Sequence, residues 1–407
     1  MIQPSSDSGQ HFSGKHLVSG QYLVSEQRLG SGQRLIVKAD KWLLSALTWI
    51  PILVAVIIWG VFNQGLARDM AIGIVDHDHT QFSRELVRHY DASPSLDVQN
   101  HYTDTLSAKE ALQSGEIYAY IVIPSNSFKH VLQGKPPQIS AFTNTQYILI
   151  GRLINSALLQ AQGTFNAKLE AGKVLLGGDT TPVQALGQAV PVRSQITPLF
   201  NSNTNYSQFL LGAVVPAIWQ IAIVVGTVMT LAANLRLRGK EQWFKDAPIL
   251  NVFRTLAPYS LVFVAQGFLM LFWFYIGLGW PFHGDIAILL LAQILMVIAC
   301  MIMGSVFFFL SLDATRAMSF AGAFTAPSFA FMGITFPVTE MNGIAQAWRS
   351  MLPVSHYIEA QVYQSNYGAT WADTLNTLIP MAGYIVPFIL MLLLIRKNSV
   401  SAKAVTS

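Results

Sequence analysis

Few of the residues are charged and only one is a cysteine, and both shortages restrict the class of protein. Charged residues make up 11% of the 407 and hydrophobic residues 52%, whereas a soluble domain carries about a quarter charged residues. This deficit predicts a chain whose surface largely faces lipid. The single cysteine, Cys300, lies in an apolar run, which excludes both a disulfide framework and a CxxC site.

Sequence signatures of enzymes are also missing. No GxxxxGK[ST] phosphate-binding loop occurs, and GSGQRL at 30–35 lacks both the Lys-Ser/Thr pair and a preceding strand. We find no Ser-His-Asp set and no paired carboxylates at a spacing suited to catalysis. We therefore predict a protein without catalytic residues, without a cofactor of its own and without a nucleic-acid partner.

Six apolar segments are long enough to cross a membrane, because a spanning helix needs about 20 residues. The first covers 42–62, and the others lie at 209–233, 255–279, 286–310, 317–336 and 376–395. The predicted fold is an α-helical membrane protein with six transmembrane helices and an α/β extracytoplasmic domain inserted between spans 1 and 2. The predicted domains are a flexible cytoplasmic tail (1–33), an interfacial helix with the first span (34–63), the outer domain (64–208), a five-span domain (209–397) and a short tail (398–407).

The distribution of lysine and arginine predicts the orientation. Basic residues precede the first span, crowd the link between the second and third spans, and follow the sixth span, whereas PFHGD at 281–285 has none. Cytoplasmic loops carry the excess of Lys and Arg. Both termini of this multi-pass membrane protein are therefore predicted to be cytoplasmic.

The region 70–143 alternates short β-like and helix-like runs, which predicts a small α/β domain. It begins with AIGIV (71–75), a predicted strand, followed by the run Asp76-His77-Asp78-His79. We interpret this run as the turn into a helix, with Asp78 as its N-cap and Gln81 three residues later. Metal binding by the two histidines is the alternative, although side chains adjacent in a turn usually diverge.

Four stretches in this order resemble the permease subunits of type-2 ABC exporters, in the branch with a large domain between the first two spans. They are IGIVDHDHTQFSRELVRHYDASP, EALQSGEIYAYIVIPSNSFKHVLQGKPPQI, FNSNTNYSQFLLGAVVPAIWQ and GITFPVTEMNGIAQAWRSMLPVSHYIEA. The resemblance covers residues 35–397. It implies a partner ATPase subunit that holds ATP and magnesium, a second permease (identical or similar), membrane lipid around both and, in some systems, a periplasmic adaptor.

The resemblance also implies a short coupling helix in the cytoplasmic link LRLRGKEQWFKDAPI (235–249). Gly239 matches a glycine of the family's pattern, but Lys240 replaces its usual small hydroxyl residue. We expect contact with the ATPase through Arg238, Gly239, Lys240, Glu241 and Trp243, with Glu241, Trp243 and Phe244 forming a charged and aromatic knob. Positive-inside charge with an aromatic anchor is the alternative interpretation.

The segment 337–363 is too polar to span a membrane and too apolar for a free loop. Pro337 and Pro353 interrupt it, and irregular backbone at membrane depth is tolerated where protein or a cavity surrounds it. The resemblance implies a re-entrant helical hairpin, for which we single out the site residues Phe336, Pro337, Glu340, Pro353 and His356. Arg349 and Glu359 would also lie near the outer boundary, and interfacial anchoring by Trp348 and Tyr357 is the alternative.

The predicted function is that of the permease subunit of an ATP-driven exporter for an amphipathic or lipophilic substrate, such as a drug-like molecule, a lipid or a peptide. A membrane receptor with an outer sensing domain would need a cytoplasmic output module. An ion-coupled secondary transporter would show paired repeats and intramembrane charges. The sequence offers neither pattern, so both remain alternatives of lower rank.

Overall fold

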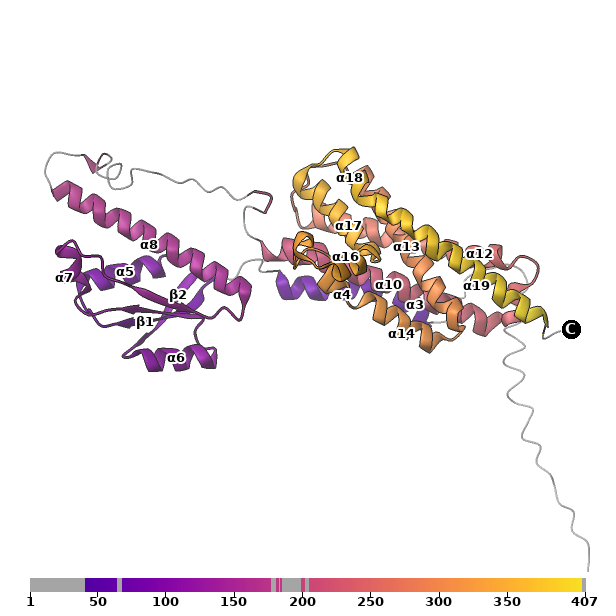
Figure 1. Ribbon diagram of the computed structural model, residues 1–407, viewed down its shortest axis with the longest axis horizontal. Helices are drawn as coiled ribbons and strands as arrows, with labels where there is room; N and C mark the ends of the chain where they lie inside the picture. The colour runs from indigo at the N-terminus through magenta and orange to yellow at the C-terminus, as the bar shows by residue number, and fades with distance from the viewer. Residues whose placement is uncertain are drawn as a thin grey trace, which may run out of the picture. The chain divides into compact units, whose positions relative to one another are not determined.

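The computed structural model describes residues 41–63, 68–176, 181–182, 184, 199–201 and 205–404. The chain divides into two compact units, one formed by Met1–Asn63 with Tyr206–Ser407 and the other by Gln64–Asn205. We call them the helical unit and the α/β unit (Figure 1). The predicted tail 1–33 and residues 34–40 of the predicted interfacial helix lie outside the described residues.

Within the described residues, four helices of the helical unit are long and apolar enough to cross a membrane: Tyr206–Arg238, Pro248–Gly277, Ile286–Ser311 and Trp371–Val400. They correspond to α10 (Tyr206–Arg238), α12 (Pro248–Phe272) with the π-helix η1 (Trp273–Gly277), α13 (Ile286–Ser311), and α18 (Trp371–Leu378), η4 (Ile379–Tyr384) and α19 (Ile385–Ala404) together. The last helix continues to Ala404, through most of the predicted tail 398–407. No proline or glycine follows Arg396 to end it.

The first and fifth predicted spans are interrupted helices. The first consists of α3 (Lys41–Leu47) and α4 (Trp49–Phe62), which are separated at Thr48. The fifth consists of α14 (Ala314–Thr325) and the short α15 (Ser328–Phe331), and Pro327 lies at the break because its ring cannot continue a helix. The described part of the chain thus does not show six continuous spanning helices, and six membrane passes stay a prediction.

Basic residues gather at one end of the helical unit. Trp243, just after α10, packs against Phe308 and Phe309 near the end of α13. Asn398 in α19 donates to the Phe309 carbonyl at 3.0 Å, which brings the end of α19 to the same place. The structure therefore collects at this end the Lys and Arg residues that flank these helix ends: Arg236, Arg238, Lys240, Lys245, Arg316, Arg396 and Lys397.

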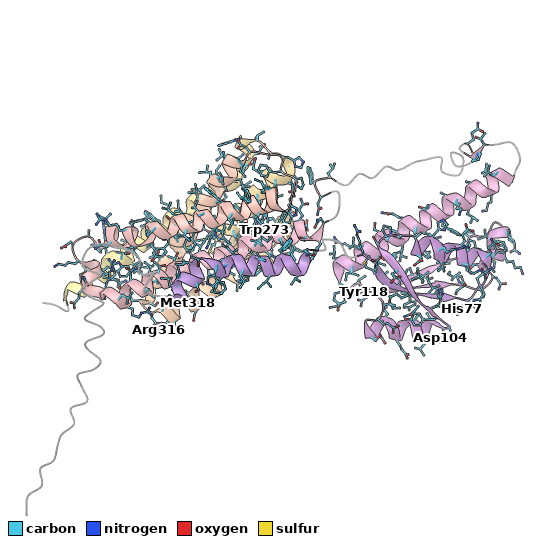
Figure 2. The ribbon with its side chains drawn as sticks, turned by 180° about the vertical axis from the view of Figure 1, so that it is seen from behind. His77, Asp104, Tyr118, Trp273, Arg316 and Met318 are labelled. Atoms are coloured by element: carbon cyan, nitrogen blue, oxygen red, sulfur yellow. The ribbon has the colours of Figure 1, made fainter. Side chains whose placement is uncertain are left out.

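The α/β unit is built on a four-stranded sheet of order β2-β1-β3-β4. The strands are β1 (Met70–Asp76), β2 (Leu96–Tyr102), β3 (Ala119–Ile123) and β4 (Ser140–Thr143). β1 runs parallel to β2 and β3, and β4 is antiparallel to β3. Because parallel strands end at one edge, His77 after β1 and Asp104 after β2 lie at the same edge of the sheet (Figure 2).

Helices cover both faces of this sheet. One face packs on α5 (Gln81–Asp91), α7 (Ser127–Leu132) and the long α8 (Ile148–Leu176), around a core that includes Ile72, Phe82 and Phe165. The other face packs on α6 (Thr105–Ser114). Gly115 ends α6 in the left-handed conformation, as its sequence predicts. The strand–helix alternation therefore gives the expected small α/β fold.

The remaining described elements of the helical unit connect its long helices. They are α11 (Lys240–Phe244), η2 (Val338–Glu340), α16 (Gly343–Ser350), α17 (Pro353–Val362) and η3 (Tyr363–Tyr367). The two regions singled out in the sequence, 235–249 and 337–363, both fall in these connections.

Candidate functional site

The link between α10 and α12 forms a short helix, α11, as the resemblance implied. Gly239 precedes it with φ 75° and ψ 158°, a backbone conformation that is essentially restricted to glycine. A Cβ at this position would meet nothing within 4 Å. The requirement for glycine here therefore comes from the backbone turn and not from crowding.

Trp243 and Phe244 do not form the expected knob, which corrects that part of the sequence prediction. They are 1% and 2% exposed, so their side chains belong to the core of the helical unit. The two rings stack at 5.2 Å, and Trp243 lies 6.0 Å from Phe309. The Trp243 Nε1–H also donates to Thr255 Oγ1 of α12 at 3.3 Å. The partners of these two rings lie on α12 and α13. Because these partners lie outside the segment 235–249, that segment alone did not reveal that the rings are buried.

Hydrogen bonds from a side chain of α12 also hold the end of α11. Asn251 in α12 donates from Nδ2 to the carbonyls of Trp243 and Lys245, at 3.0 and 3.1 Å. The helix also packs against α10 and α19. As a result, α11 is fixed to the helices around it, and the side chains of Glu241, Gln242 and Lys245 form its exposed face.

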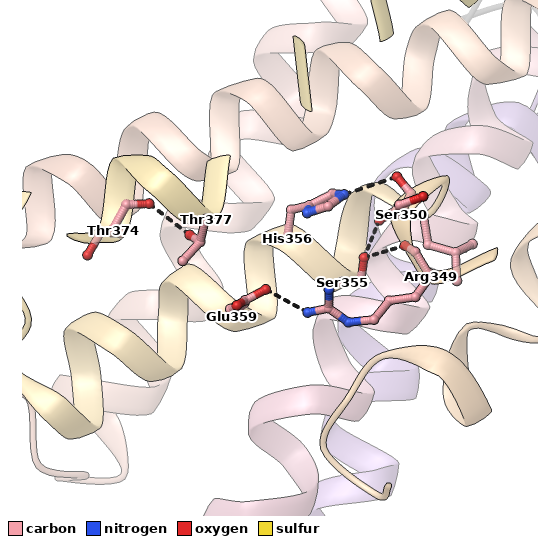
Figure 3. A network of polar contacts seen from close by, with 8 residues as sticks. Arg349, Ser350, Ser355, His356, Glu359, Thr374 and Thr377 are labelled. Carbon is pink, nitrogen blue, oxygen red and sulfur yellow. Dashed lines mark hydrogen bonds and ion pairs between the residues drawn. The ribbon is translucent and has the colours of Figure 1, made fainter. Parts of the chain in front are cut away.

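The segment 337–363 folds into two short helices, α16 and α17, with a turn at Met351 and Leu352. Arg349 Nη2 and Glu359 Oε2 form an ion pair of 2.6 Å across this hairpin (Figure 3). Ser355 Oγ donates to the Arg349 carbonyl at 2.7 Å, and a His356 ring nitrogen lies 3.1 Å from the Ser350 carbonyl. The hydroxyl of Tyr384 donates to the Met351 carbonyl at 2.6 Å, which holds the turn against η4.

The five predicted residues of this segment occupy two environments. Phe336, Pro337 and Glu340 are exposed, whereas Pro353 and His356 are buried in the first turn of α17. The structure thus assembles a polar cluster around Arg349, Glu359 and His356, and it leaves Glu340 outside that cluster.

A buried glutamine that sequence reasoning left without a role ties α10 to this hairpin. Gln220 is fully buried; its Oε1 accepts from the Val354 N–H at 2.9 Å and its Nε2 donates to Ser328 Oγ at 2.8 Å. The N–H groups in the first turn of a helix have no partner within that helix, and Gln220 satisfies one of them for α17. A polar residue in an apolar run was the available signal, but its partner lies 134 residues away.

A second glutamine joins two connections at the opposite end of the unit from the basic residues. Gln364, in η3, accepts through Oε1 from the Asp285 N–H at 2.6 Å. Asp285 caps α13 and accepts from Trp371 Nε1 at 2.9 Å. The Ala287 N–H, and then Trp371, lower the pKa of the Asp285 carboxyl below its usual value. Its charged form is therefore favoured at this helix N-terminus.

The run Asp76-His77-Asp78-His79 is a turn, but Asp78 is not the helix cap that the sequence predicted. The structure assigns the N-cap to Thr80, which forms a capping box with Ser83. His79 has a positive φ of 51°, so the chain turns there and α5 begins at Gln81. Asp78 instead accepts through Oδ2 from the Thr80 hydroxyl (2.5 Å) and from the Phe128 N–H of α7 (3.3 Å). The turn therefore links the first turns of two helices.

Within the described residues, no group of three or more His, Cys, Asp or Glu side chains is arranged to hold a metal ion. Asp76 Oδ1 is occupied by the backbone N–H groups of Asp78 and His79, at 2.9 and 3.1 Å. The two carboxylates of the turn thus already serve as hydrogen-bond acceptors for this chain.

Comparison with known families gives one match that covers most of the chain. Residues 41–394 match the family model described as ABC-2 family transporter protein. Comparisons with curated proteins and with solved structures give no match. The matched range contains the α/β unit and most of the described helical unit, including α11 and the hairpin of α16 and α17. The chain therefore belongs to the ABC-2 family, and it is a multi-pass membrane component of an ABC transporter, partnered by an ABC ATPase.

Proposed function

We propose that the chain is the permease subunit of an exporter that moves an amphipathic or lipophilic substrate outward across a bacterial inner membrane. A partner ATPase would bind ATP and magnesium, and a second permease, identical or similar, would complete the membrane part. In this arrangement the α/β unit is extracytoplasmic, and both termini are cytoplasmic.

The observation that carries the proposal is the attachment of α11. Its exposed face presents Glu241, Gln242 and Lys245, whereas Trp243 and Phe244 are fixed in the core. Aromatic contacts to α13 and hydrogen bonds to α12 make α11 continuous with the helix bundle. A push on its exposed face would therefore move α10, α12 and α13 together, because a tightly packed interior transmits displacement.

The gathering of basic residues supports the orientation. The ends of α10, α13 and α19, together with the start of α14, bring lysines and arginines to the end of the unit that carries α11. Such an excess marks the cytoplasmic side, which is also where an ATPase has access to ATP. The α16–α17 hairpin would then lie toward the outer side.

Cysteine labelling tests the orientation, because Cys300 is fully buried. Gln113→Cys in α6 and Gln242→Cys in α11 each place one thiol at an exposed position. A membrane-impermeant maleimide added to spheroplasts should label only Gln113→Cys, and Gln242→Cys should react after permeabilisation. The reverse pattern would refute the proposed orientation.

Reconstitution tests the activity itself. Inverted vesicles that contain the chain should accumulate a lipophilic dye only when the ATPase partner and ATP are both present. A bifunctional cross-linker on Gln242→Cys should join the two proteins, whereas one on Gln113→Cys should not. Dye movement by the chain alone would contradict an ATP-driven mechanism.

A further inference from the structure

A cavity of about 450 Å³ lies in the α/β unit, between the C-terminal part of α8 and the segment that joins α7 to β4. Its volume falls within the range of small-molecule sites, about 300–1,000 Å³. Nothing in the proposed transport mechanism uses it. The cavity therefore needs an explanation of its own.

The cavity has an apolar floor that its surroundings hold in place. Phe82 of α5 is 7% exposed and packs against Phe165 of α8 at 5.3 Å and Phe128 of α7 at 6.3 Å. Leu169 and Ile139 line the cavity beside it. An apolar part of a ligand would bury its surface here without displacing a polar partner.

One wall is a stiff segment of chain. Gly134 begins it with a positive φ of 71°, and Pro136 and Pro137 follow. Proline fixes φ and has no N–H, so this wall holds its shape and offers no backbone donor at two successive positions. The N–H groups of Gly134 and Lys135 already donate to the carbonyls of Val131 and His130, so we look to side chains for the polar recognition groups.

A relay of hydrogen bonds orients one of these side chains. The Tyr90 hydroxyl donates to Gln162 Oε1, and Gln162 Nε2 donates to Asn166 Oδ1 at 3.1 Å. This bond occupies the oxygen of the Asn166 amide, so the group that Asn166 can offer to a ligand is its Nδ2 donor. Within the described part of the chain, this nitrogen has no hydrogen-bond acceptor.

Two lysines add positive charge to the lining. Lys135 is exposed and makes no ion pair among the described residues. Lys173 donates to Glu170 Oε1 at 2.6 Å, but an ammonium group has three N–H donors, so two stay available. Glu170 is the only lining carboxylate among the described residues, and it is already paired. The available groups around the apolar floor are therefore hydrogen-bond donors and carry net positive charge.

We propose that this cavity binds a small amphipathic anion, with its apolar chain on Phe82 and Leu169 and its carboxylate or similar group on Lys135, Lys173 and Asn166. This inference goes beyond the proposed function, because it assigns a ligand site to the α/β unit that operates without ATP. Charge complementarity selects an anion over a neutral or cationic amphiphile of the same length.

Photo-cross-linking of the full chain in nanodiscs of zwitterionic lipid tests the site. The probe is a hexadecanoic acid that carries a diazirine in its chain, and the matched probe is the alcohol of the same chain. We expect the acid to label peptides within 131–139 and 162–173, and the alcohol to label them about tenfold less, the factor that one charge-assisted hydrogen bond contributes.

Variants then separate charge recognition from simple apolar trapping. Lys135→Glu with Lys173→Glu changes only exposed side chains and should reduce labelling of these peptides by about tenfold. Lys109→Glu is the matched control, because Lys109 is exposed on α6 at the other face of the sheet. Equal labelling by acid and alcohol, unchanged labelling of the double variant, or labelling confined to 206–404 would each overturn the proposal. None of these measurements involves ATP or the partner ATPase, so their failure is distinct from a failure of the proposed transport function.

Discussion

Replacing Trp243 by alanine should disconnect α11 from the helix bundle. The side chain is 1% exposed, stacks on Phe244 at 5.2 Å and reaches Phe309 at 6.0 Å. Truncation of a buried Trp typically costs about 3–5 kcal/mol of unfolding free energy. In a unit of this size that loss corresponds to a decrease in melting temperature of roughly 6–20 °C, at about 2–4 °C per kcal/mol.

Trp243→Phe is the matched variant because it keeps an aromatic ring in the stack. It removes the Nε1–H bond to Thr255 Oγ1, which measures 3.3 Å, and a neutral hydrogen bond contributes about 0.5–1.5 kcal/mol. The Thr255 hydroxyl still donates to the Asn251 carbonyl at 2.8 Å. We therefore expect a melting temperature much closer to that of the wild type.

Cys300 supplies the stability assay, because its buried thiol reacts with a thiol-specific fluorophore only when the bundle opens. Transport per ATP hydrolysed, measured after reconstitution with the ATPase, supplies the functional assay. Trp243→Ala should lower this ratio, whereas Glu241→Ala should leave the melting temperature unchanged because Glu241 is exposed. If Trp243→Ala kept both the melting temperature and the transport per ATP hydrolysed of the wild type, the proposed role of Trp243 in attaching α11 would be refuted.

Three further predictions concern the turn before α11 and the α/β unit. Gly239→Ala should lower the free energy of unfolding by about 1–3 kcal/mol, because φ 75° with ψ 158° strains any residue other than glycine. Thiol labelling of Cys300 on heating measures this loss. Gly322→Ala is the control and should show no such loss, because Gly322 lies inside α14 with open space at its Cβ. Thr80→Ala removes the N-cap of α5 and should lower the free energy of unfolding by about 1 kcal/mol. Pulse proteolysis across a urea series would detect this loss, and an unchanged urea midpoint would contradict the assignment of Thr80 as the N-cap. The hydrogen bond from Lys168 lowers the pKa of Glu85 below its ordinary value of 4.5, so this pair stabilises the folded unit above that pH and loses its effect as the pH falls through the lowered pKa. Because Lys168 is largely exposed and Glu85 is partly exposed, the effect should be below about 1 kcal/mol. Lys168→Met should abolish that part of the pH dependence of the urea midpoint.

The class of protein and the order of its elements were predictable from local patterns. Apolar runs of about 20 residues identify helices of membrane length, and four of the predicted segments coincide with long helices. The alternation of strand-like and helix-like runs identified the α/β unit, and the end of α6 coincides with Gly115, a residue type that commonly ends helices. These features depend on residues close together in the chain, so a sequence window contains all the necessary information.

The choice of helix cap was not predictable in this way. Asp78 and Thr80 are both good N-cap residues, and the positive φ of His79 decided between them. That φ belongs to a turn in which Asp76 accepts from two backbone N–H groups and Asp78 reaches α7 at Phe128. The contact to α7 spans 50 residues of sequence, so it exists only in the folded unit.

By itself, the sequence determined where the chain is apolar, where it is basic and where its strands and helices alternate. Tertiary structure alone decided which polar and aromatic side chains face inward. It turned Trp243 into the core, brought Arg349 to Glu359 and placed Gln220 at the first turn of α17. The physical reason is that hydropathy and helix signals act between neighbours in the chain, whereas burial and hydrogen bonding depend on partners that only folding brings together.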